Sequence, residues 1–212
     1  MHIYVISGLG ADEKVFCHTY FAQHTVVHLP WLPVITSESL QQYAMRMAAT
    51  IDTGIPFMLM GLSFGGMVAI EIAKVYKPQK IILLSTIKTQ YEKPTYMKAL
   101  QKIPAHKYFP LTWMQKMKTT ASFMFGVTSS DEQNLINTYV TNIDIAYLKW
   151  SIDKIIHWQN ETYPGNVIHI HGSSDRIFPI QNIKADFVIK NGGHFMLMNK
   201  AGEVNEILRK IL

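Results

Sequence analysis

The chain alternates short apolar segments with longer stretches of helical periodicity. Six segments of five or six residues are rich in Val, Ile and Leu, and polar residues rarely interrupt them; they are 2–7, 25–29, 56–60, 80–85, 166–171 and 186–190. Strands of a parallel sheet that is covered on both faces have this composition, whereas strands with one solvated face alternate apolar and polar residues. The pattern therefore predicts six parallel strands.

Helical patterns lie between and after these strands. Residues 39–51 begin with Ser39 and carry Gln42 three positions on, which is the arrangement of a capping box. Residues 64–76 are followed by Pro78, which helps to end a helix, and residues 200–212 form an amphipathic pattern that contains Lys and Arg. Alternation of strands and helices predicts an α/β fold with right-handed crossover connections.

Residues 87–164 interrupt this alternation, because they contain no clear strand. Aromatic, Lys and Met residues recur at helical spacing over 96–102, 112–125 and 131–159. About eighty residues is too long for a plain connection between a helix and a strand. We therefore expect a helical cap with its own packing over 87–164, inserted into an α/β core formed by 1–86 and 165–212. Aromatic residues of this cap can line a pocket, but most are expected to form its core; they are Tyr96, Tyr108, Phe109, Trp113, Phe123, Phe125, Tyr139, Trp150 and Trp158.

Composition narrows the class of protein. The chain has 212 residues, of which 48% are hydrophobic and 17% are charged, a globular composition that fits one domain. The net charge of +5 comes from scattered lysines, and Arg occurs only at positions 46, 176 and 209, which argues against a nucleic-acid partner. The apolar runs are too short to span a membrane, and the N-terminus lacks the pattern of a signal peptide. With Cys17 as its single cysteine, the chain is expected to be cytoplasmic, with a small molecule as its partner.

The strongest local motif is Gly61-Leu62-Ser63-Phe64-Gly65, which directly follows an expected strand and opens an expected helix. A Gly-x-Ser-x-Gly turn in this context presents a nucleophilic serine at the carboxyl edge of a sheet. The glycines allow a sharp, strained turn, and the helix N-terminus favours developing negative charge. A plain strand-to-helix turn with an N-cap serine is the structural alternative.

A serine hydroxyl needs a base, and two later segments supply candidates. Asp175 follows the strand at 166–171, and His194 follows the last strand, after Asn191-Gly192-Gly193. Both therefore lie at the same edge of the sheet as Ser63, in the order nucleophile, acid, base. Asp186 is the less favoured acid, because it begins a strand and so lies at the opposite edge.

Taken together, GLSFGG, HGSSDRIFP and GGHF resemble the nucleophile, acid and histidine motifs of the α/β-hydrolase superfamily, in the same order and over nearly the whole chain. The resemblance implies that Ser63 attacks a carbonyl, that His194 transfers its proton and that Asp175 orients His194. It also implies the α/β-hydrolase fold in a reduced form. Because the chain starts directly at the strand before the oxyanion loop, we expect six parallel strands, with 25–29 at one edge.

The same resemblance assigns an oxyanion hole. The first strand ends in Ser7-Gly8-Leu9-Gly10, where the family commonly has His in place of Ser7. The backbone N–H groups of Leu9 and Phe64 would bind the oxyanion, and Gly8, Leu9 and Met196 would contact the substrate. A dinucleotide-binding turn is disfavoured here, because Lys14 lies near the position of the third glycine of that motif.

Neither a metal nor a cofactor is expected. His169 and His171 lie on the same side of a strand, but no further ligand cluster accompanies them. The favoured function is hydrolysis of a small or medium acyl ester, thioester or lactone. Two alternatives stay open: another chemistry of the same fold, such as C–C bond hydrolysis, perhydrolysis or a lyase reaction, and a non-enzymatic ligand-binding protein.

Overall fold

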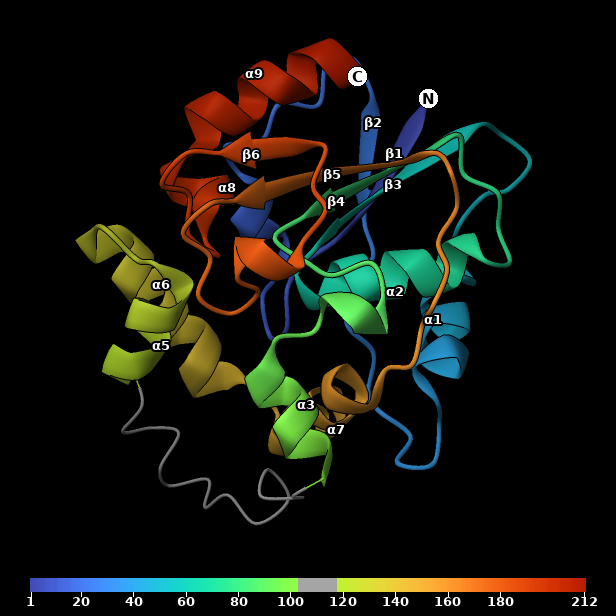
Figure 1. The fold of residues 1–212 in the computed structure, drawn as a ribbon. Coiled ribbons are helices and arrows are strands. Elements are labelled where there is room, and N and C mark those ends of the chain that lie inside the picture. The colour runs from blue at the N-terminus through green and yellow to red at the C-terminus, as the bar shows by residue number, and fades with distance from the viewer. Residues whose placement is uncertain (103–117) are drawn as a thin grey trace.

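A parallel β-sheet lies between two layers of helices in the computed structural model, which describes residues 1–102 and 118–212 (Figure 1). Its six strands are ordered β2-β1-β3-β4-β5-β6, and every neighbouring pair is parallel. This confirms the predicted sheet, with the segment at 25–29 on one edge. The strands are β1 (His2–Ile6), β2 (Thr25–His28), β3 (Phe57–Leu62), β4 (Lys80–Leu84), β5 (Val167–Gly172) and β6 (Phe187–Ile189).

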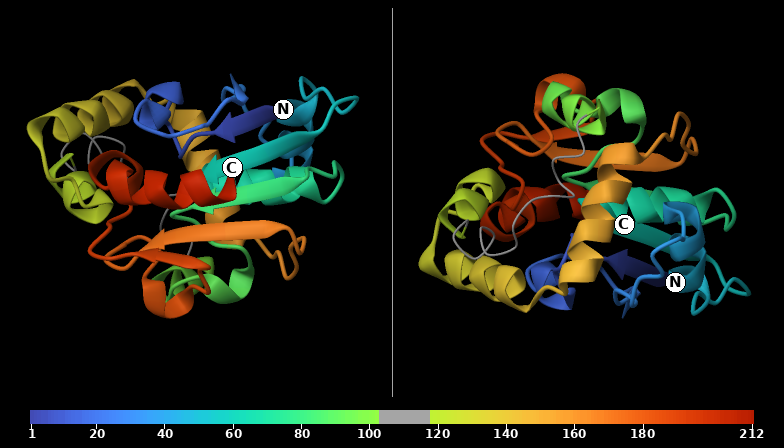
Figure 2. Two further views of the ribbon diagram at one scale, coloured as in Figure 1. Left: turned by 90° about the horizontal axis from the view of Figure 1, so that it is seen from above. Right: turned by 90° about the horizontal axis from the view of Figure 1, so that it is seen from below.

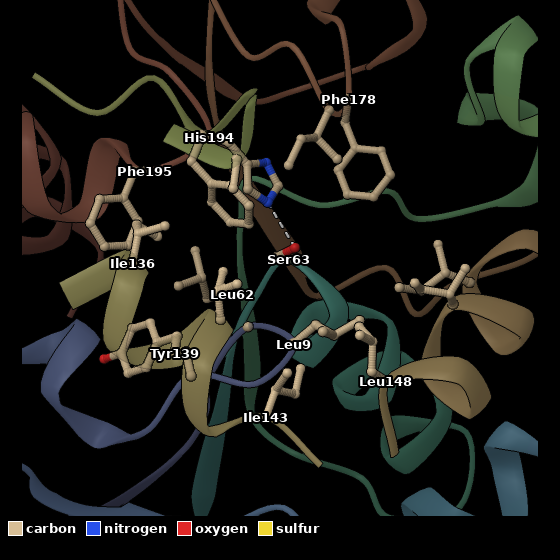
Figure 3. A pocket seen from close by; sticks show the side chains of 18 of the residues that line it. Leu9, Leu62, Ser63, Ile136, Tyr139, Ile143, Leu148, Phe178, His194 and Phe195 are labelled. Atoms are coloured by element: carbon tan, nitrogen blue, oxygen red, sulfur yellow. Dashed lines mark hydrogen bonds between the residues drawn. The ribbon is translucent and has the colours of Figure 1, made fainter. Parts of the chain in front are cut away.

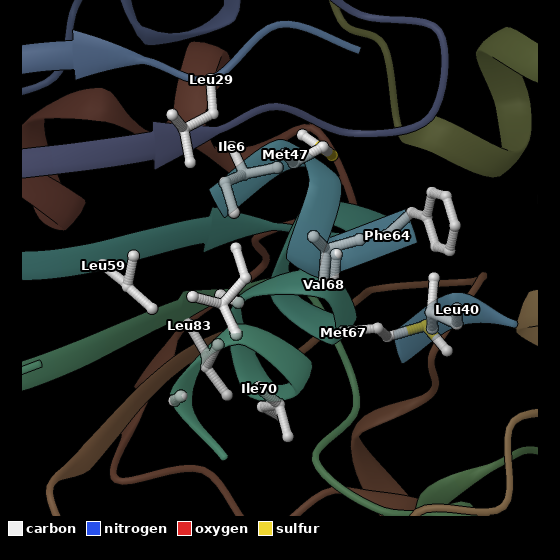
Figure 4. Close-up of a cluster of buried hydrophobic side chains, with 14 of the residues drawn as sticks. Ile6, Leu29, Leu40, Met47, Leu59, Phe64, Met67, Val68, Ile70 and Leu83 are labelled. Carbon is white, nitrogen blue, oxygen red and sulfur yellow. The ribbon is translucent and has the colours of Figure 1, made fainter. Parts of the chain in front are cut away.

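Helices cover both faces of the sheet, as continuous apolar strands require. One face packs against α1 (Leu40–Ala48) and α2 (Phe64–Ala73), and the other packs against α8 (Met196–Asn199) and α9 (Ala201–Ile211) (Figures 1 and 2). Consecutive strand residues alternate between the two cores: Leu59 faces α2, while Met60 faces α9. Figure 4 shows the α2 side of the sheet, where Leu59 and Leu83 belong to the same cluster as Val68 and Ile70.

The predicted capping box is present at α1. Gln42 N donates to Ser39 Oγ at 3.1 Å, and Ser39 N donates to Gln42 Oε1 at 2.8 Å. Two N–H groups that the helix itself cannot pair are thereby satisfied. The side chains of Ser39 and Gln42 were therefore sufficient to predict where this helix begins.

Between β4 and β5 the structure describes α3 (Thr95–Lys102), α5 (Lys118–Phe125), α6 (Ser130–Asn142) and α7 (Ile145–His157). The helical pattern expected over 131–159 is broken into two helices, because Asp144 caps a new helix by accepting from Tyr147 N at 2.7 Å. Short 3₁₀ turns occur at η1 (Glu13–Phe16), η2 (Gln90–Glu92) and η4 (Ile180–Asn182). Residues 112–117, and with them Trp113, lie outside the described residues, as do Tyr108 and Phe109.

These intervening helices do not have a core of their own in the described part of the chain. Trp150 and Trp158 are buried in the cluster that contains α1 and α2, whereas Tyr139 belongs to the cluster on the α9 side. In the described residues, the apolar faces of these helices extend the two cores of the sheet. Tyr96 and Phe123 are exposed rather than core residues.

Lys93 ties the end of α7 to the segment that follows β4. Its side chain is buried, and Nζ donates to Ile156 O at 2.7 Å and also to Trp158 O. Burial, with the nearby charge of Lys98, lowers the pKa of Lys93 to about 8. The ammonium group thus satisfies carbonyls that the C-terminus of α7 leaves unpaired.

The start of α2 lies unusually close to β1. A Cβ atom on Gly65 would lie 2.3 Å from Ser7 O and 2.4 Å from Ile6 O, and a Cβ atom on Gly61 would lie 2.5 Å from Gly65 O. All of these neighbours are backbone atoms, which cannot move aside as a flexible side chain can. Gly61 and Gly65 are therefore required by the close approach of strand and helix.

We predict that Gly65→Ala lowers the free energy of unfolding by at least about 3 kcal/mol, because the methyl group overlaps backbone carbonyls. Gly202→Ala is the matched control: it lies in α9, its Cβ would meet no atom within 4 Å, and it should be neutral or stabilising by up to about 1 kcal/mol. Urea unfolding followed by circular dichroism measures both. Equal stability of the Gly65→Ala variant and the wild type would contradict the overlap.

Candidate active site

Ser63 occupies a strained turn between β3 and α2. Its φ of 53° and ψ of −121° are outside the regions that residues with a Cβ normally adopt. Two hydrogen bonds hold this conformation: Ser63 N donates to Leu84 O at 2.9 Å, and Thr86 Oγ1 donates to Ser63 O at 2.6 Å. Such strain costs about 1–3 kcal/mol and persists only where the surroundings enforce it.

The structure brings together the serine, histidine and aspartate that the sequence predicted. His194 Nε2 lies 2.8 Å from Ser63 Oγ (Figure 3), and His194 Nδ1 lies 2.8 Å from Asp175 Oδ2. The imidazole is buried against the rings of Phe125 and Phe178, whose centroids lie 5.3 Å and 5.7 Å from it. With Nδ1–H donating to the carboxylate, Nε2 is free to accept the serine proton.

Asp175 is held in its ionised form. Burial raises the pKa of its carboxyl group, but the interaction with His194 and the hydrogen bond from the Phe178 N–H outweigh burial, so the pKa lies below its ordinary value. Oδ1 accepts from the N–H groups of Ile177 and Phe178 at 2.8 Å and 2.9 Å, which leaves Oδ2 for His194. The orientation of the carboxylate is therefore fixed by its own turn.

Asp186 lies at the opposite edge of the sheet, as the sequence predicted. It immediately precedes β6, and its Oδ2 accepts from His169 N at 2.7 Å. Its carboxylate therefore accepts a hydrogen bond from the backbone of β5 and does not bond to His194.

Two further histidines lie behind the acid. His171 Nε2 is 2.7 Å from Phe178 O and 3.5 Å from Asp175 Oδ2, and its Nδ1 is 3.3 Å from His169 Nε2. Burial lowers the pKa of both imidazoles, so both are neutral at neutral pH. If His171 Nε2–H donates to Phe178 O, its Nδ1 accepts from His169 Nε2–H. This contact with the acid was not predicted from the sequence; the available signal was that His171 lies at the same strand end, four residues before Asp175.

The loop after β1 lies beside Ser63. A Cβ atom on Gly8 would lie 3.6 Å from Ser63 Cβ, and the loop is closed by Ala11 N, which donates to Gly8 O at 3.0 Å. Ser7 Oγ donates to Ala11 O at 2.6 Å, so the serine at the position where His is common supports the loop itself. Gly8 is therefore next to Ser63 and Leu9 follows it in the loop, while Phe64 is the first residue of α2, whose N–H has no partner within the helix.

A cavity of about 550 Å³ opens from Ser63 (Figure 3). Its lining comes from the loop after β1, from the turns that carry Ser63 and His194, and from α3, α5, α6 and α7. The described lining is almost wholly apolar and includes Leu62, Ile136, Val140, Ile143, Leu148 and Ile152. Apart from Ser63 and His194, its polar side chains are Lys149, which is exposed, and Tyr139, whose hydroxyl donates to Asp12 Oδ1 at 2.7 Å.

Met196 was expected to contact the substrate, but it does not line the cavity in the described residues. Its side chain is fully buried in the cluster on the α9 side of the sheet, and it is absent from the described lining of the cavity. As the first residue of α8, it packs into the hydrophobic core between the sheet and α9. Phe195 and His194, its neighbours in the chain, contribute to the cavity instead.

The described residues, 1–102 and 118–212, contain neither a cluster of metal-ligating side chains nor a helix that could span a membrane. Within these ranges, no three His, Cys, Asp or Glu side chains converge on a site that could hold a metal ion. In the same ranges, every helix is too short or too polar to cross a lipid bilayer.

Solved structures similar to this chain cover nearly all of it. A hydrolase from Oleispira antarctica has a TM-score of 0.71 at 14% identity, over 99% of this chain and 90% of that one. Est816, described as an enzyme that degrades N-acyl homoserine lactones, has a TM-score of 0.70 at 15% identity, over 100% and 93%. A thermophilic esterase has a TM-score of 0.65 at 19% identity, over 99% and 88%.

No protein-family model matches the chain, and no curated protein matches it. The similar structures nevertheless extend over the whole parallel sheet and the helices on both of its faces. The chain has the α/β-hydrolase fold, in a six-stranded, all-parallel form.

Proposed function

We propose that this protein is a serine hydrolase that cleaves an ester, thioester or lactone with an apolar acyl group, through an acyl-enzyme on Ser63. One observation carries the proposal: Ser63, His194 and Asp175 form a continuous hydrogen-bonded series whose serine opens into an apolar cavity. A serine in an ordinary turn needs neither the strained backbone nor a histidine at 2.8 Å.

The reaction follows from these contacts. Ser63 Oγ attacks the carbonyl carbon while His194 Nε2 accepts its proton, and Asp175 stabilises the imidazolium. The N–H groups of Leu9 and Phe64 donate to the oxyanion, at the N-terminus of α2. His194 then protonates the leaving oxygen or sulfur. Water, activated by His194, attacks the acyl-enzyme, releases the acid and restores Ser63.

The cavity supports an acyl group without polar substituents. Its described walls offer few hydrogen-bonding side chains beyond Ser63 and His194, and the Tyr139 hydroxyl is already engaged by Asp12. A polar acyl chain would lose its bonds to water there without replacement. The volume of about 550 Å³ lies within the range of small-molecule pockets. That an esterase and a lactone-degrading enzyme have similar structures agrees with this choice of reaction.

We expect one covalent adduct when the protein reacts with a serine-directed fluorophosphonate, because only Ser63 is activated by His194. Intact-mass spectrometry should detect one added mass in the wild type and none in Ser63→Ala, which should also lose ester turnover. An adduct that persists in Ser63→Ala would exclude Ser63 as the nucleophile. Labelling of Ser63 without turnover of any ester, thioester or lactone would favour the ligand-binding alternative.

Asp175→Asn should reduce kcat by about 10³–10⁴-fold, because an amide at this position cannot stabilise the imidazolium and favours the wrong tautomer of His194. Asp186→Asn is the matched control, since an amide oxygen can still accept from His169 N. Steady-state kinetics with a nitrophenyl ester measures both variants. A larger loss in Asp186→Asn than in Asp175→Asn would reverse the assignment of the acid.

The dependence of kcat/KM on the length of the acyl chain tests the proposed acyl pocket. With nitrophenyl esters from about two to about sixteen acyl carbons, kcat/KM should peak at short to medium chains, because methylenes beyond the apolar walls next to Ser63 gain no further burial. Emulsified long-chain triglycerides should be poor substrates. A maximum at the longest chains, with activation at an oil interface, would identify a lipase and contradict the enclosed acyl pocket.

A further inference from the structure

Trp31 contacts both parts of the proposed oxyanion hole from outside the cavity. It lies in the segment after β2, and its indole Nε1 donates to Gly8 O at 3.0 Å. Its ring also stacks on the ring of Phe64, with the centroids 5.3 Å apart and the planes 13° apart. One side chain therefore touches the peptide that precedes Leu9 and the residue that provides the second N–H.

The hydrogen bond to Gly8 O determines where the Leu9 N–H points. The carbonyl of Gly8 and the N–H of Leu9 belong to one planar trans peptide, so they point in opposite directions. Gly8 and Leu9 line the cavity, whereas Trp31 is not among the described lining residues. The carbonyl is held toward Trp31, so the Leu9 N–H points away from Trp31, and Leu9 and Ser63 line the same cavity (Figure 3).

Gly8 O accepts a second hydrogen bond, from Ala11 N at 3.0 Å. That bond lies within the loop itself, so it closes the turn but does not connect the loop to the rest of the molecule. The bond from Trp31 links the loop to a segment from another strand. We therefore expect loss of the indole N–H to loosen the loop without unfolding it.

Trp31 is itself rigidly held. The Tyr43 hydroxyl, on α1, accepts from Leu32 N at 2.8 Å and donates to Leu32 O at 2.9 Å, which fixes the residue after Trp31. The indole also packs against the rings of Tyr43 and Tyr147, with centroids 6.2 Å and 5.5 Å away. A donor anchored in this way can hold the loop in one orientation before substrate arrives.

We propose that Trp31 is a positioning residue that orients the Leu9 N–H and the start of α2 for binding of the oxyanion. This inference rests on the proposed function, because it concerns the transition state of that reaction. Trp31 does not touch the substrate, and it acts only through Gly8, Leu9 and Phe64.

The test compares Trp31→Phe with Trp150→Phe. Phe at position 31 keeps an aromatic ring against Phe64 but removes the donor to Gly8 O. Trp150 belongs to the same aromatic cluster, 6.5 Å from the Phe64 ring, but its Nε1 has no partner within the described part of the chain. Trp150→Phe therefore reproduces the loss of ring size without the loss of a hydrogen bond. Melting temperatures, kcat and KM are measured for both, on the turnover that Ser63→Ala abolishes.

In Trp31→Phe we expect kcat to fall about tenfold with KM nearly unchanged, a smaller loss than the 10²–10³-fold that follows removal of an oxyanion donor, because Ala11 N still holds Gly8 O. The inhibition constant of an alkyl trifluoromethyl ketone, which forms an oxyanion on Ser63, should rise by a similar factor. Binding of the alcohol with the same alkyl chain should not change. Trp150→Phe should keep the wild-type kcat and inhibition constants.

An unchanged kcat and ketone affinity in Trp31→Phe would overturn the inference while leaving the serine mechanism intact. Equal losses in Trp31→Phe and Trp150→Phe, with alcohol binding weakened as much as ketone binding, would also overturn it, because packing alone would then explain them. Turnover that survives in Ser63→Ala would instead reject the proposed function.

Discussion

The close approach of α2 to β1 is the constraint on which the site depends. Gly65 allows the helix to start against the carbonyls of Ile6 and Ser7, where any side chain would overlap. This contact brings the turn that carries Ser63 next to the loop that carries Leu9, although the two segments are more than fifty residues apart in the chain. The proposed nucleophile and the proposed backbone donors of the oxyanion hole can then meet at one point without any long side chain reaching across. The strained backbone of Ser63 is held in place by its hydrogen bonds with Leu84 O and Thr86 Oγ1.

The carboxylate of Asp175 is buried and depends on hydrogen bonds from the protein. Asp175 and His194 are almost wholly removed from water, so the carboxylate must be stabilised by donors of the protein. Backbone N–H groups of its own turn supply two of them, and His194 supplies the third. His171 bonds to the carbonyl of Phe178, whose N–H serves Asp175, so the neutral imidazole helps to hold the turn that holds the acid. A buried network of this kind is rigid because each donor and acceptor depends on the next.

The helices between β4 and β5 shape the cavity because they are packed into the cores of the sheet. Trp150 and Trp158 join the cluster around α2, and Lys93 fastens the C-terminal end of α7. The same packing therefore positions both Ser63 and the cavity walls that α6 and α7 form. Most of the described aromatic residues of this segment serve that attachment or face solvent, while the described cavity walls are largely aliphatic, with Phe125, Phe178 and Phe195 near His194.

Local patterns in the sequence determined the six strands, their parallel arrangement and the capping box at Ser39, because strand composition and helix capping follow short-range rules. The order of the motifs along the chain determined the edge of the sheet at which Ser63, Asp175 and His194 meet. Which residues line the cavity depended on the tertiary structure. Met196 and Phe195 are adjacent and both apolar, yet only Phe195 faces the cavity, because the direction in which α8 leaves the turn decides between core and pocket. The support from Trp31 and His171 was likewise beyond local patterns. The hydrogen bond of Trp31 joins segments from different strands, and the role of His171 depends on how the turn after β5 folds back over it, so both exist only once the chain is packed.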